Sequence, residues 1–346
     1  MKKGAPSPRG ERGRERGMGS MRGMGSTRGM GSTVKRLRAY APAGIGNFAA
    51  GFDVLGAAVA PEDGSLWGDQ VEVAEAGETR LVCTGPYAGR LPADPAENLV
   101  MRTRDLFEEA AGRALPPLQL TLYKGLPVCS GLGSSAASAA ATAKALNAWC
   151  GDPLFPGDLL ALAGRAEGLA SGAAHLDNVA PCLLGGLLLI PHEGPPRSLP
   201  FPGDLRIVMA SPALELATRE ARRVLPREVP LALAVEHAQN LASFVHALHT
   251  GDRGLLRASL RDIVAEPWRA DLVPGFRAAQ RGALAAGALG ASLSGAGPAV
   301  FAVALEDDAA AVAAALAEGF QSEKVESTVR ICRLDTRGAR LLEVQA

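Results

Sequence analysis

The chain has 346 residues, with 36 acidic and 36 basic side chains, and this length is enough for two ordinary domains with hydrophobic cores. Residues 1–33 carry eight Lys or Arg and two Glu, so the rest of the chain carries 28 basic and 34 acidic side chains. An acidic body argues against nucleic acid as the main partner. No apolar run reaches membrane-spanning length, and the N-terminus lacks the hydrophobic core of a signal peptide.

The cysteines indicate a cellular location, and neither they nor the N-terminal segment indicates a binding or catalytic role. The five cysteines are scattered without pair spacing, which favours neither a disulfide framework nor a zinc site. A reducing compartment suits them, so we expect a cytoplasmic protein. Residues 1–33 repeat Arg-Gly-Met-Gly-Ser, and this composition predicts a disordered basic tail to which we assign no function.

The most informative segment is 127–145, which is rich in glycine and serine in its first half and almost pure alanine in its second. Alanine is the best helix former, so a loop leads directly into a helix N-terminus. Gly131 and Gly133 permit unusual backbone conformations and carry no Cβ that would hold a phosphate away. The unpaired amides of residues 134–136 would point at an anion along the helix dipole. The segment therefore predicts a phosphate site.

Three alternatives share parts of this pattern. A small-residue turn that caps a tightly packed helix has the same composition. A Walker loop needs a lysine after the last glycine, and none stands there. A Rossmann loop needs an acidic residue at a strand end about 20 residues on, where the chain has Asp152 in a turn. We therefore predict a phosphate loop of another design, in which Ser134 and Ser135 add hydroxyls toward phosphate or its magnesium ion.

The first half of the chain alternates strands and helices. Segment 41–53 has too much Gly and Pro for a helix and too little charge for a solvated loop, so we expect it to line a site. Its polar side chains, Asn47 and Asp53, also suit turns in which they bond their own backbone. We predict strands over 34–40, 55–60, 70–74 and 118–123, a turn at Gly68-Asp69, and helices over 98–111 and from Asp158 onward.

Further polar side chains stand where sites are common. Lys124 precedes the phosphate loop, either as an exposed cation at a strand end or as a counter-charge to a nucleotide. Glu167 borders the apolar face of the helix from Asp158, where a carboxylate needs a cation; pairing with Arg165 is the alternative. His175, Asp177 and Asn178 fall in an expected loop over 171–181, before an expected buried strand over 183–190. A histidine satisfied within the core is the alternative for His175.

The sequence after about residue 200 predicts a second domain. A Pro-rich stretch near residue 200 is a plausible domain boundary. Arg222 and Arg269 are, by themselves, ordinary surface arginines. The last β-α-β unit resembles half of a ferredoxin-type fold. We predict strands over 205–210, 299–304 and 328–334, helices over 231–248 and 307–317, and a small-residue loop over 290–298.

Four motifs together resemble the GHMP small-molecule kinases, and among them the homoserine kinases. They are residues 34–56, Pro-x-x-Ser-Gly-Leu-Gly-Ser-Ser-Ala-Ala from Pro127, Ala-Glu-Gly before Ser-Gly-x-x-His-x-Asp-Asn-Val-Ala-Pro, and Leu-Ser-Gly-Ala-Gly-Pro. The resemblance extends from Val34 to Thr336. The loop indicates only the superfamily, whereas the His175–Pro181 motif, with Asn47 six residues before Asp53, is narrower.

The resemblance implies an α+β protein with the two-domain GHMP kinase fold. After the tail at 1–33, an N-terminal ATP-binding domain would span 34–203, with mixed α/β structure and a left-handed β-α-β crossover that departs from the usual right-handed rule. A ferredoxin-like C-terminal domain would span 204–346. The resemblance also implies a homodimer, while the acidic body and the lack of a membrane-spanning run predict no nucleic-acid or membrane partner.

The resemblance further implies ATP-dependent phosphorylation of the side-chain hydroxyl of L-homoserine, which gives O-phospho-L-homoserine and ADP in threonine biosynthesis. Ser135 and Glu167 would hold Mg²⁺, and Asn178 would join them as a catalytic residue. Asn98 and Lys124 would contact the nucleotide. The ATP phosphates would be wrapped by Pro127, Val128, Cys129, Ser130, Gly131, Leu132, Gly133, Ser134, Ser135, Ala136 and Ala137. Homoserine would be surrounded by Asn47, Asp53, His175, Asn178, Arg222 and Arg269.

The chemistry of homoserine agrees with these implied roles. Its ammonium needs an anion such as Asp53, and its carboxylate suits the fork geometry of Arg222 and Arg269. Asn178 can orient the hydroxyl but cannot take its proton, so we expect catalysis by alignment and charge neutralisation. Asp177 is the residue that would contradict this expectation. Two alternatives are a GHMP enzyme that acts on another small alcohol and a nucleotide-binding regulatory protein without catalysis.

Overall fold

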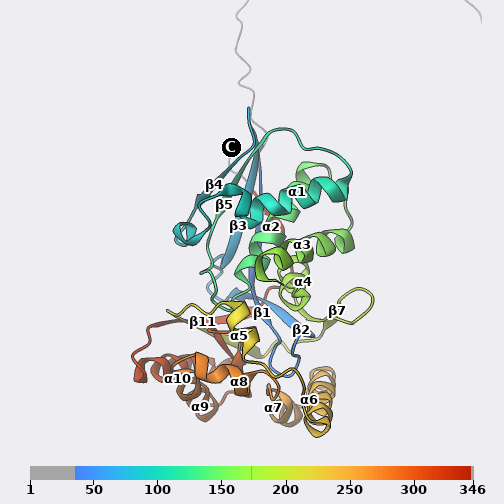
Figure 1. Cartoon of the computed structure of the whole chain (residues 1–346). Coiled ribbons are helices and arrows are strands. Elements are labelled where there is room, and N and C mark those ends of the chain that lie inside the picture. The colour runs from blue at the N-terminus through green and yellow to red at the C-terminus, as the bar shows by residue number, and fades with distance from the viewer. Residues whose placement is uncertain (1–35, 173, 344–346) are drawn as a thin grey trace, which may run out of the picture. The chain divides into compact units, whose positions relative to one another are not determined.

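Strands from both halves of the chain join in one sheet (Figure 1). The structure is a computed structural model that describes residues 36–172 and 174–343, so the predicted tail lies outside the described residues. The strand order is β4-β5-β3-β1-β2-β11-β8-β10-β9; β12 pairs with β1, and β6 joins β2 to β7. The strands are β1 (Arg36–Gly46), β2 (Leu55–Pro61), β3 (Gly68–Glu75), β4 (Arg80–Thr84), β5 (Leu118–Tyr123), β6 (Leu187–Leu189), β7 (Arg197–Leu199), β8 (Leu205–Pro212), β9 (Gly290–Leu293), β10 (Val300–Leu305), β11 (Ser327–Leu334) and β12 (Arg340–Leu342).

A parallel pair distinguishes the N-terminal end of this sheet. Strands β4 and β5 run parallel, and α1 (Leu99–Ala111) lies in the connection between them. The neighbouring pair β3 and β5 is antiparallel, as are β1 and β3. A β-α-β crossover is therefore present in the N-terminal part of the chain, as the resemblance implied. The left hand of this crossover remains a prediction.

Helix α2 (Ser134–Trp149) is packed on every side. It contacts β1 and β3 of the sheet and also α1, α3 (Pro156–Ser171) and α4 (Leu176–Leu184). Seven of its alanines are fully buried: Ala136, Ala137, Ala139, Ala140, Ala141, Ala143 and Ala145. Because alanine carries only a methyl group, neighbouring elements can approach the helix closely and fix it in place. The sequence pattern thus determines where the first turn of α2 lies.

The C-terminal part has the ferredoxin-like order. Its strands lie side by side in the order β11-β8-β10-β9, which is 4-1-3-2 when they are numbered in chain order. Helix α10 (Ala309–Ser322) packs on β8, β10 and β11, and α9 (Phe276–Ala285) packs on β9 and α10. This arrangement confirms the predicted C-terminal fold, whereas the boundary at residue 203 remains a prediction. The remaining helices are α5 (Thr218–Arg223), α6 (Leu231–Thr250), α7 (Arg253–Ser259) and α8 (Glu266–Arg269).

Two segments differ from the sequence-based expectation. The expected loop over 171–181 contains the start of α4, and His175 takes the N-cap position. Asp177 suits the first turn of a helix, because its negative charge interacts favourably with the helix dipole. The expected strand over 183–190 was also wrong in its bounds. Helix α4 continues to Leu184, and only β6, Leu187–Leu189, is a strand.

Two further boundaries were drawn in the wrong place. The expected small-residue loop over 290–298 begins as strand β9, which pairs with β10. The expected turn at Gly68-Asp69 is instead the start of β3, paired with Pro42 and Ala41 of β1. Pairing with a neighbouring strand overrides the weak strand propensity of these residues.

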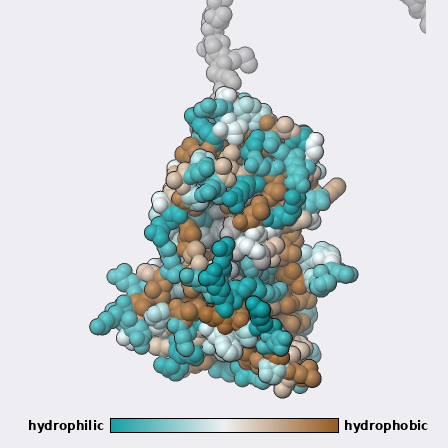
Figure 2. All heavy atoms as spheres, in the orientation of Figure 1, coloured by the Kyte–Doolittle hydropathy of each residue, from teal (hydrophilic) through white to brown (hydrophobic). Residues whose placement is uncertain are grey.

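The surface of the described residues mixes hydrophilic and hydrophobic side chains. On the face shown in Figure 2, hydrophilic residues cover much of the surface, and hydrophobic residues form smaller patches between them. Within the residues that the structure describes, no helix combines the length and apolar character needed to cross a membrane.

We predict that Gly319→Ala destabilises the fold by about 2 kcal/mol, although alanine favours helices more than glycine. A Cβ atom at Gly319 in α10 would lie 2.3 Å from the Cα atom of Ala279 in α9, and backbone cannot move away cheaply. Urea unfolding measures the change in free energy. Gly157→Ala in α3 is the matched control, because a Cβ there meets nothing within 4 Å. Equal effects of the two substitutions would contradict the close packing of α9 on α10.

Candidate active site

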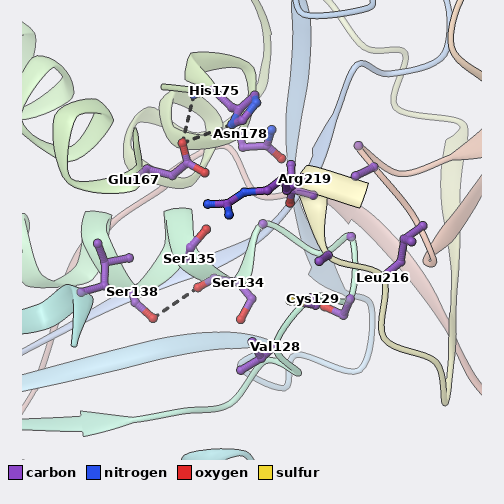
Figure 3. Close-up of a pocket in the computed structure, with 18 of the residues that line it drawn as sticks. Val128, Cys129, Ser134, Ser135, Ser138, Glu167, His175, Asn178, Leu216 and Arg219 are labelled. Atoms are coloured by element: carbon purple, nitrogen blue, oxygen red, sulfur yellow. Dashed lines mark hydrogen bonds and ion pairs between the residues drawn. The ribbon is translucent and has the colours of Figure 1, made fainter. Parts of the chain in front are cut away.

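A cavity of about 570 Å³ lies at the N-terminal end of α2 (Figure 3). Its wall is formed by the loop before α2, by α3, α4 and α5, and by residues near positions 50 and 296. The predicted site residues converge here from segments far apart in the sequence. They all line the cavity except Pro127, Leu132, Ala136 and Ala137.

In the loop before α2, the carbonyl groups and the amides differ in their hydrogen bonding. Five consecutive carbonyls, from Cys129 to Gly133, accept hydrogen bonds from Leu216 N, Ala299 N, Ser294 Oγ, Gly44 N and Ala137 N, at 2.6–3.0 Å. The amides of residues 131–136 have no hydrogen-bond partner within 36–172 and 174–343. The carbonyls thus hold the loop in place, and a row of backbone donors is left for a ligand at the cavity.

Gly131 and Gly133 make this loop possible. Both have left-handed backbone conformations, with φ of 77° and 65°. A Cβ on Gly131 would also lie 2.7 Å from the carbonyl oxygen of Ser294. The glycines therefore serve both the turn and the close approach of the segment at 294–297.

A buried ion pair supports the first turn of α2. Lys124 is 2% exposed and Asp69 is fully buried, and the two form a short salt bridge. The Lys124 ammonium also donates to the carbonyl of Ser134, at 2.9 Å, and to the hydroxyl of Ser138, at 3.0 Å. Asp69 accepts from Ser138 Oγ and from the amides of Gly125 and Leu126. Every donor of Lys124 is therefore used within the protein, so its contact with a nucleotide remains a prediction that this geometry does not support.

Asn98 is also used within the protein. It is buried, and its Oδ1 atom accepts from the amide of Val100, at 3.0 Å, as the N-cap of α1. Its Nδ2 atom lies 3.7 Å from Cys83 Sγ. Asn98 shares the cavity wall with Leu91, Pro92 and Leu99, which form an apolar surface. Its contact with a nucleotide remains a prediction.

Glu167 brings a carboxylate to the cavity opposite the α2 loop. It is 4% exposed, and its Oε2 atom accepts from the backbone amide of His175, at 3.0 Å. The His175 Nδ1 atom lies 3.4 Å from the same oxygen, and the hydrogen bond to this carboxylate raises the pKa of His175. Figure 3 shows the Ser135 hydroxyl on the side of the cavity that faces Glu167. Ser135 and Glu167 are thus placed across the cavity from one another.

A second carboxylate, Asp177, lies at the floor of the cavity, where it holds Asn47 and Asn178. It is 3% exposed, and it accepts from the amide of Asn47, at 3.0 Å, and from Nδ2 of Asn178, at 3.3 Å. Burial raises the pKa of Asp177 to about 6, and the negative charge of Asp53 adds to the shift. Because the Asn178 Nδ2 atom donates to Asp177, the Asn178 Oδ1 atom is the end of this side chain that can accept a hydrogen bond from a ligand.

Opposite charges face each other at the mouth of the cavity. Arg222 of α5 and Asp53 form a two-pronged ion pair, with distances of 2.8–3.1 Å. Arg269 is buried and donates to the carbonyls of Ala221 and Gly295, at 3.1 and 3.0 Å. The Phe52 ring lies 5.7 Å from the Arg222 guanidinium and 5.6 Å from that of Arg269. The Phe52 ring therefore lies close to both arginines, beside the carboxylate of Asp53.

Two family models and several solved structures are similar to this chain. The family model described as GHMP kinases N terminal domain matches residues 98–186, and the one described as GHMP kinases C terminal matches residues 244–322. The structure of homoserine kinase from Cytophaga hutchinsonii is similar with a TM-score of 0.82 and 35% sequence identity, over 90% of this chain and 98% of that one. The chain belongs to the GHMP kinase family.

Two solved structures with lower sequence identity show a likeness of fold alone. L. major mevalonate kinase in complex with R-mevalonate has a TM-score of 0.61 and 18% identity, over 86% of this chain and 96% of that one. Lactococcus lactis galactokinase complexed with galactose has a TM-score of 0.63 and 16% identity, over 90% and 97% of the two chains. Family membership makes this GHMP kinase a phosphotransferase and leaves its substrate to the chemistry of the site.

Sequence reasoning missed three residues that shape the site of this GHMP kinase. Phe52 stands beside the predicted Asp53, but an aromatic residue in a Gly-rich segment gave no signal of its own. Asp69 was taken for a turn residue, and only the tertiary structure brings it to Lys124. Arg219 lines the cavity from α5, three residues before the predicted Arg222. The run Thr218–Arg223 carries three arginines, which could have marked α5 as a basic wall.

We predict that Asp69→Asn costs about 3 kcal/mol of folding stability, because it leaves the buried Lys124 ammonium without its counter-charge. The double variant Asp69→Leu with Lys124→Met should cost less than the sum of its single substitutions. Urea unfolding of the wild type, the two single variants Asp69→Leu and Lys124→Met, and the double variant measures this coupling, and the same method gives the loss for Asp69→Asn. Strictly additive losses, or a loss below about 1 kcal/mol for Asp69→Asn, would contradict a structural pair beneath α2.

Proposed function

We propose that this GHMP kinase is a homoserine kinase, which transfers the γ-phosphoryl group of ATP to the side-chain hydroxyl of L-homoserine. The observation that carries the proposal is the row of free amides at residues 131–136, which shares one cavity with the Asp53 carboxylate and two arginines. A polyphosphate and a small zwitterion need these two sets of groups side by side. The similarity to the C. hutchinsonii homoserine kinase supports the same substrate.

The nucleotide fits the side of the cavity formed by the α2 loop. Backbone amides of residues 131–136 would donate to phosphate oxygens, assisted by the dipole of a 16-residue helix. The apolar wall of Leu91, Pro92 and Leu99, together with Val128, offers contact area for a base. Cys129 and Ser130, also on the wall, would complete the loop around the phosphates.

Ser135 and Glu167 form a donor set that suits Mg²⁺. Magnesium sites in kinases commonly combine one or two protein oxygens with substrate phosphates and water. Within the residues that the structure describes, no cluster of three or more His, Cys, Asp or Glu could hold a metal ion. A buried carboxylate and a hydroxyl across the cavity match the smaller donor set. When bound, magnesium would neutralise negative charge on the transferred phosphoryl group.

When homoserine binds at the cavity mouth, it would break the ion pair between Asp53 and Arg222 and contact both side chains. Its ammonium would bind Asp53, and its carboxylate would bind Arg222 and Arg269. Asn47 would assist, because its Oδ1 atom already accepts from the Asp53 amide, at 3.0 Å, and fixes that residue. Since Asp53 and Arg222 are paired without a ligand, the substrate exchanges one set of charge contacts for another.

The hydroxyl of homoserine would be aligned by Asn178. The amide oxygen of Asn178 can accept the hydroxyl hydrogen bond, because its Nδ2 atom is held by Asp177. Catalysis would then rest on alignment of the hydroxyl oxygen with the γ-phosphorus and on charge neutralisation, as expected for phosphoryl transfer. Asp177 would act through Asn47 and Asn178, without taking the proton. The homodimer and the cytoplasmic location also remain proposals.

A direct assay tests the proposed substrate. Purified protein with ATP and magnesium is given L-homoserine, R-mevalonate or galactose, and both ADP and the phosphorylated alcohol are quantified. We expect a kcat/KM for L-homoserine at least about 100-fold above those for the other two alcohols, because only an amino acid uses both Asp53 and the arginines. Preference for another alcohol would refute the homoserine assignment, and no turnover with any would favour a regulatory nucleotide-binding protein.

We predict that Glu167→Gln lowers kcat by about 100-fold or more, with a change of less than about three-fold in the KM for homoserine. The reason is that the carboxylate is proposed to serve the metal. Raising the magnesium concentration should restore part of the rate. Glu109→Gln is a control, because Glu109 is exposed and pairs with Arg165 outside the cavity. A loss confined to homoserine affinity would remove Glu167 from the metal site.

We predict that Arg222→Leu raises the KM for homoserine on the order of 10- to 100-fold and leaves the KM for ATP within about two-fold. The variant should also lose most of the preference for homoserine over 3-aminopropan-1-ol, which lacks the carboxylate. Steady-state kinetics with both alcohols gives the comparison. An unchanged preference would show that Arg222 does not bind the carboxylate.

A further inference from the structure

The charges that line the cavity are mostly engaged within the protein. Lys124 uses its donors on Asp69, Ser134 and Ser138, and Arg222 is paired with Asp53. Arg269 donates to two backbone carbonyls. Among the cations on the cavity wall, Arg219 and Arg223 of α5 remain. Neither makes a hydrogen bond or ion pair with residues 36–172 or 174–343.

Of these two arginines, Arg219 has a side chain that can be followed into the cavity (Figure 3). Figure 3 shows its side chain crossing the cavity from α5 toward the space between Glu167 and Ser135. That space adjoins the free amides of the α2 loop and the floor where Asn178 lies. An unpaired guanidinium between a phosphate loop and a metal-type donor pair is suited to an anion that carries more than one charge.

We propose that Arg219 binds the γ-phosphoryl group of the nucleotide and stabilises it during transfer. In that step the acceptor oxygen bonds to the γ-phosphorus, and the bond from this phosphorus to the oxygen that bridges to the β-phosphate breaks. The electron pair leaves with ADP, and the hydroxyl proton passes to solvent. Negative charge spreads over the oxygens of the γ-phosphoryl group in the transition state, where a guanidinium is most effective.

The position of Arg219 explains how α5 contributes to the site. Ala217 N-caps α5, and the amide of Leu216 just before it bonds to the carbonyl of Cys129 in the α2 loop, at 3.0 Å. Arg222, on the same short helix, reaches Asp53. Helix α5 therefore joins the phosphate loop to the substrate side, with Arg219 between them. The inference rests on the proposed function for the identity of the acceptor and on family membership for the nucleotide.

Binding measurements test the inference without any acceptor alcohol. Isothermal titration calorimetry with magnesium compares ADP with the β,γ-imido analogue of ATP, which differ by the γ-phosphoryl group. For Arg219→Gln we expect the affinity for the analogue to fall about ten-fold or more and that for ADP to change less than about two-fold. Equal effects on both nucleotides, or no effect on either, would overturn the proposal.

Turnover separates binding from stabilisation of the transferred group. With an accepted alcohol, Arg219→Gln should lower kcat by about 100-fold, and Arg219→Lys should recover part of this rate because it keeps the charge. Arg227→Gln is the matched control: Arg227 is exposed, follows α5 and does not line the cavity. A rise in the KM for ATP with unchanged kcat, or an equal loss in the control, would overturn the transfer role.

A wild-type protein that turns over none of the alcohols would refute the homoserine assignment, while the calorimetric comparison would still report on Arg219. Conversely, normal turnover of homoserine by Arg219→Gln would refute the Arg219 inference and leave the proposed function standing. The two failures are therefore distinguishable.

Discussion

Burial of an alanine-rich helix with an open first turn is the constraint on which this structure depends. Helix α2 is enclosed by the sheet and three helices, so its N-terminus cannot shift to find partners for its own amides. The preceding loop is held through its carbonyls by three separate segments and by α2 itself. The backbone donors that remain free are therefore fixed before any ligand arrives, which is the preorganisation that phosphoryl transfer requires.

Charge in the site is arranged in two ways. The Asp69–Lys124 pair is buried and hydrogen-bonded on all sides, so it supports α2 and is not exchangeable. The Asp53–Arg222 pair is partly exposed at the cavity mouth, where solvent weakens it and a zwitterion can replace it. Lys124 and Arg222 are both cations on the cavity wall, but burial gives Lys124 a structural role, whereas exposure leaves Arg222 open to exchange of its partner.

The sequence predicted the parts of this protein that local chemistry determines. The alanine run marked α2, and glycines at 131 and 133 marked its loop. The motif from His175 to Pro181 was found, but its conformation was wrong, because polar residues in the first turn of a helix look like those of a loop. The roles of Asp69 and Phe52 depend on partners more than 50 residues away in the sequence, which periodicity and spacing do not reveal.

The most direct test is a crystal structure with the β,γ-imido analogue of ATP, magnesium and L-homoserine. The account predicts phosphate oxygens within hydrogen-bonding distance of the amides of residues 131–136 and the amino acid between Asp53 and Arg269, with its hydroxyl beside Asn178. A nucleotide bound away from the first turn of α2, or loop amides covered by side chains of the protein itself, would contradict it.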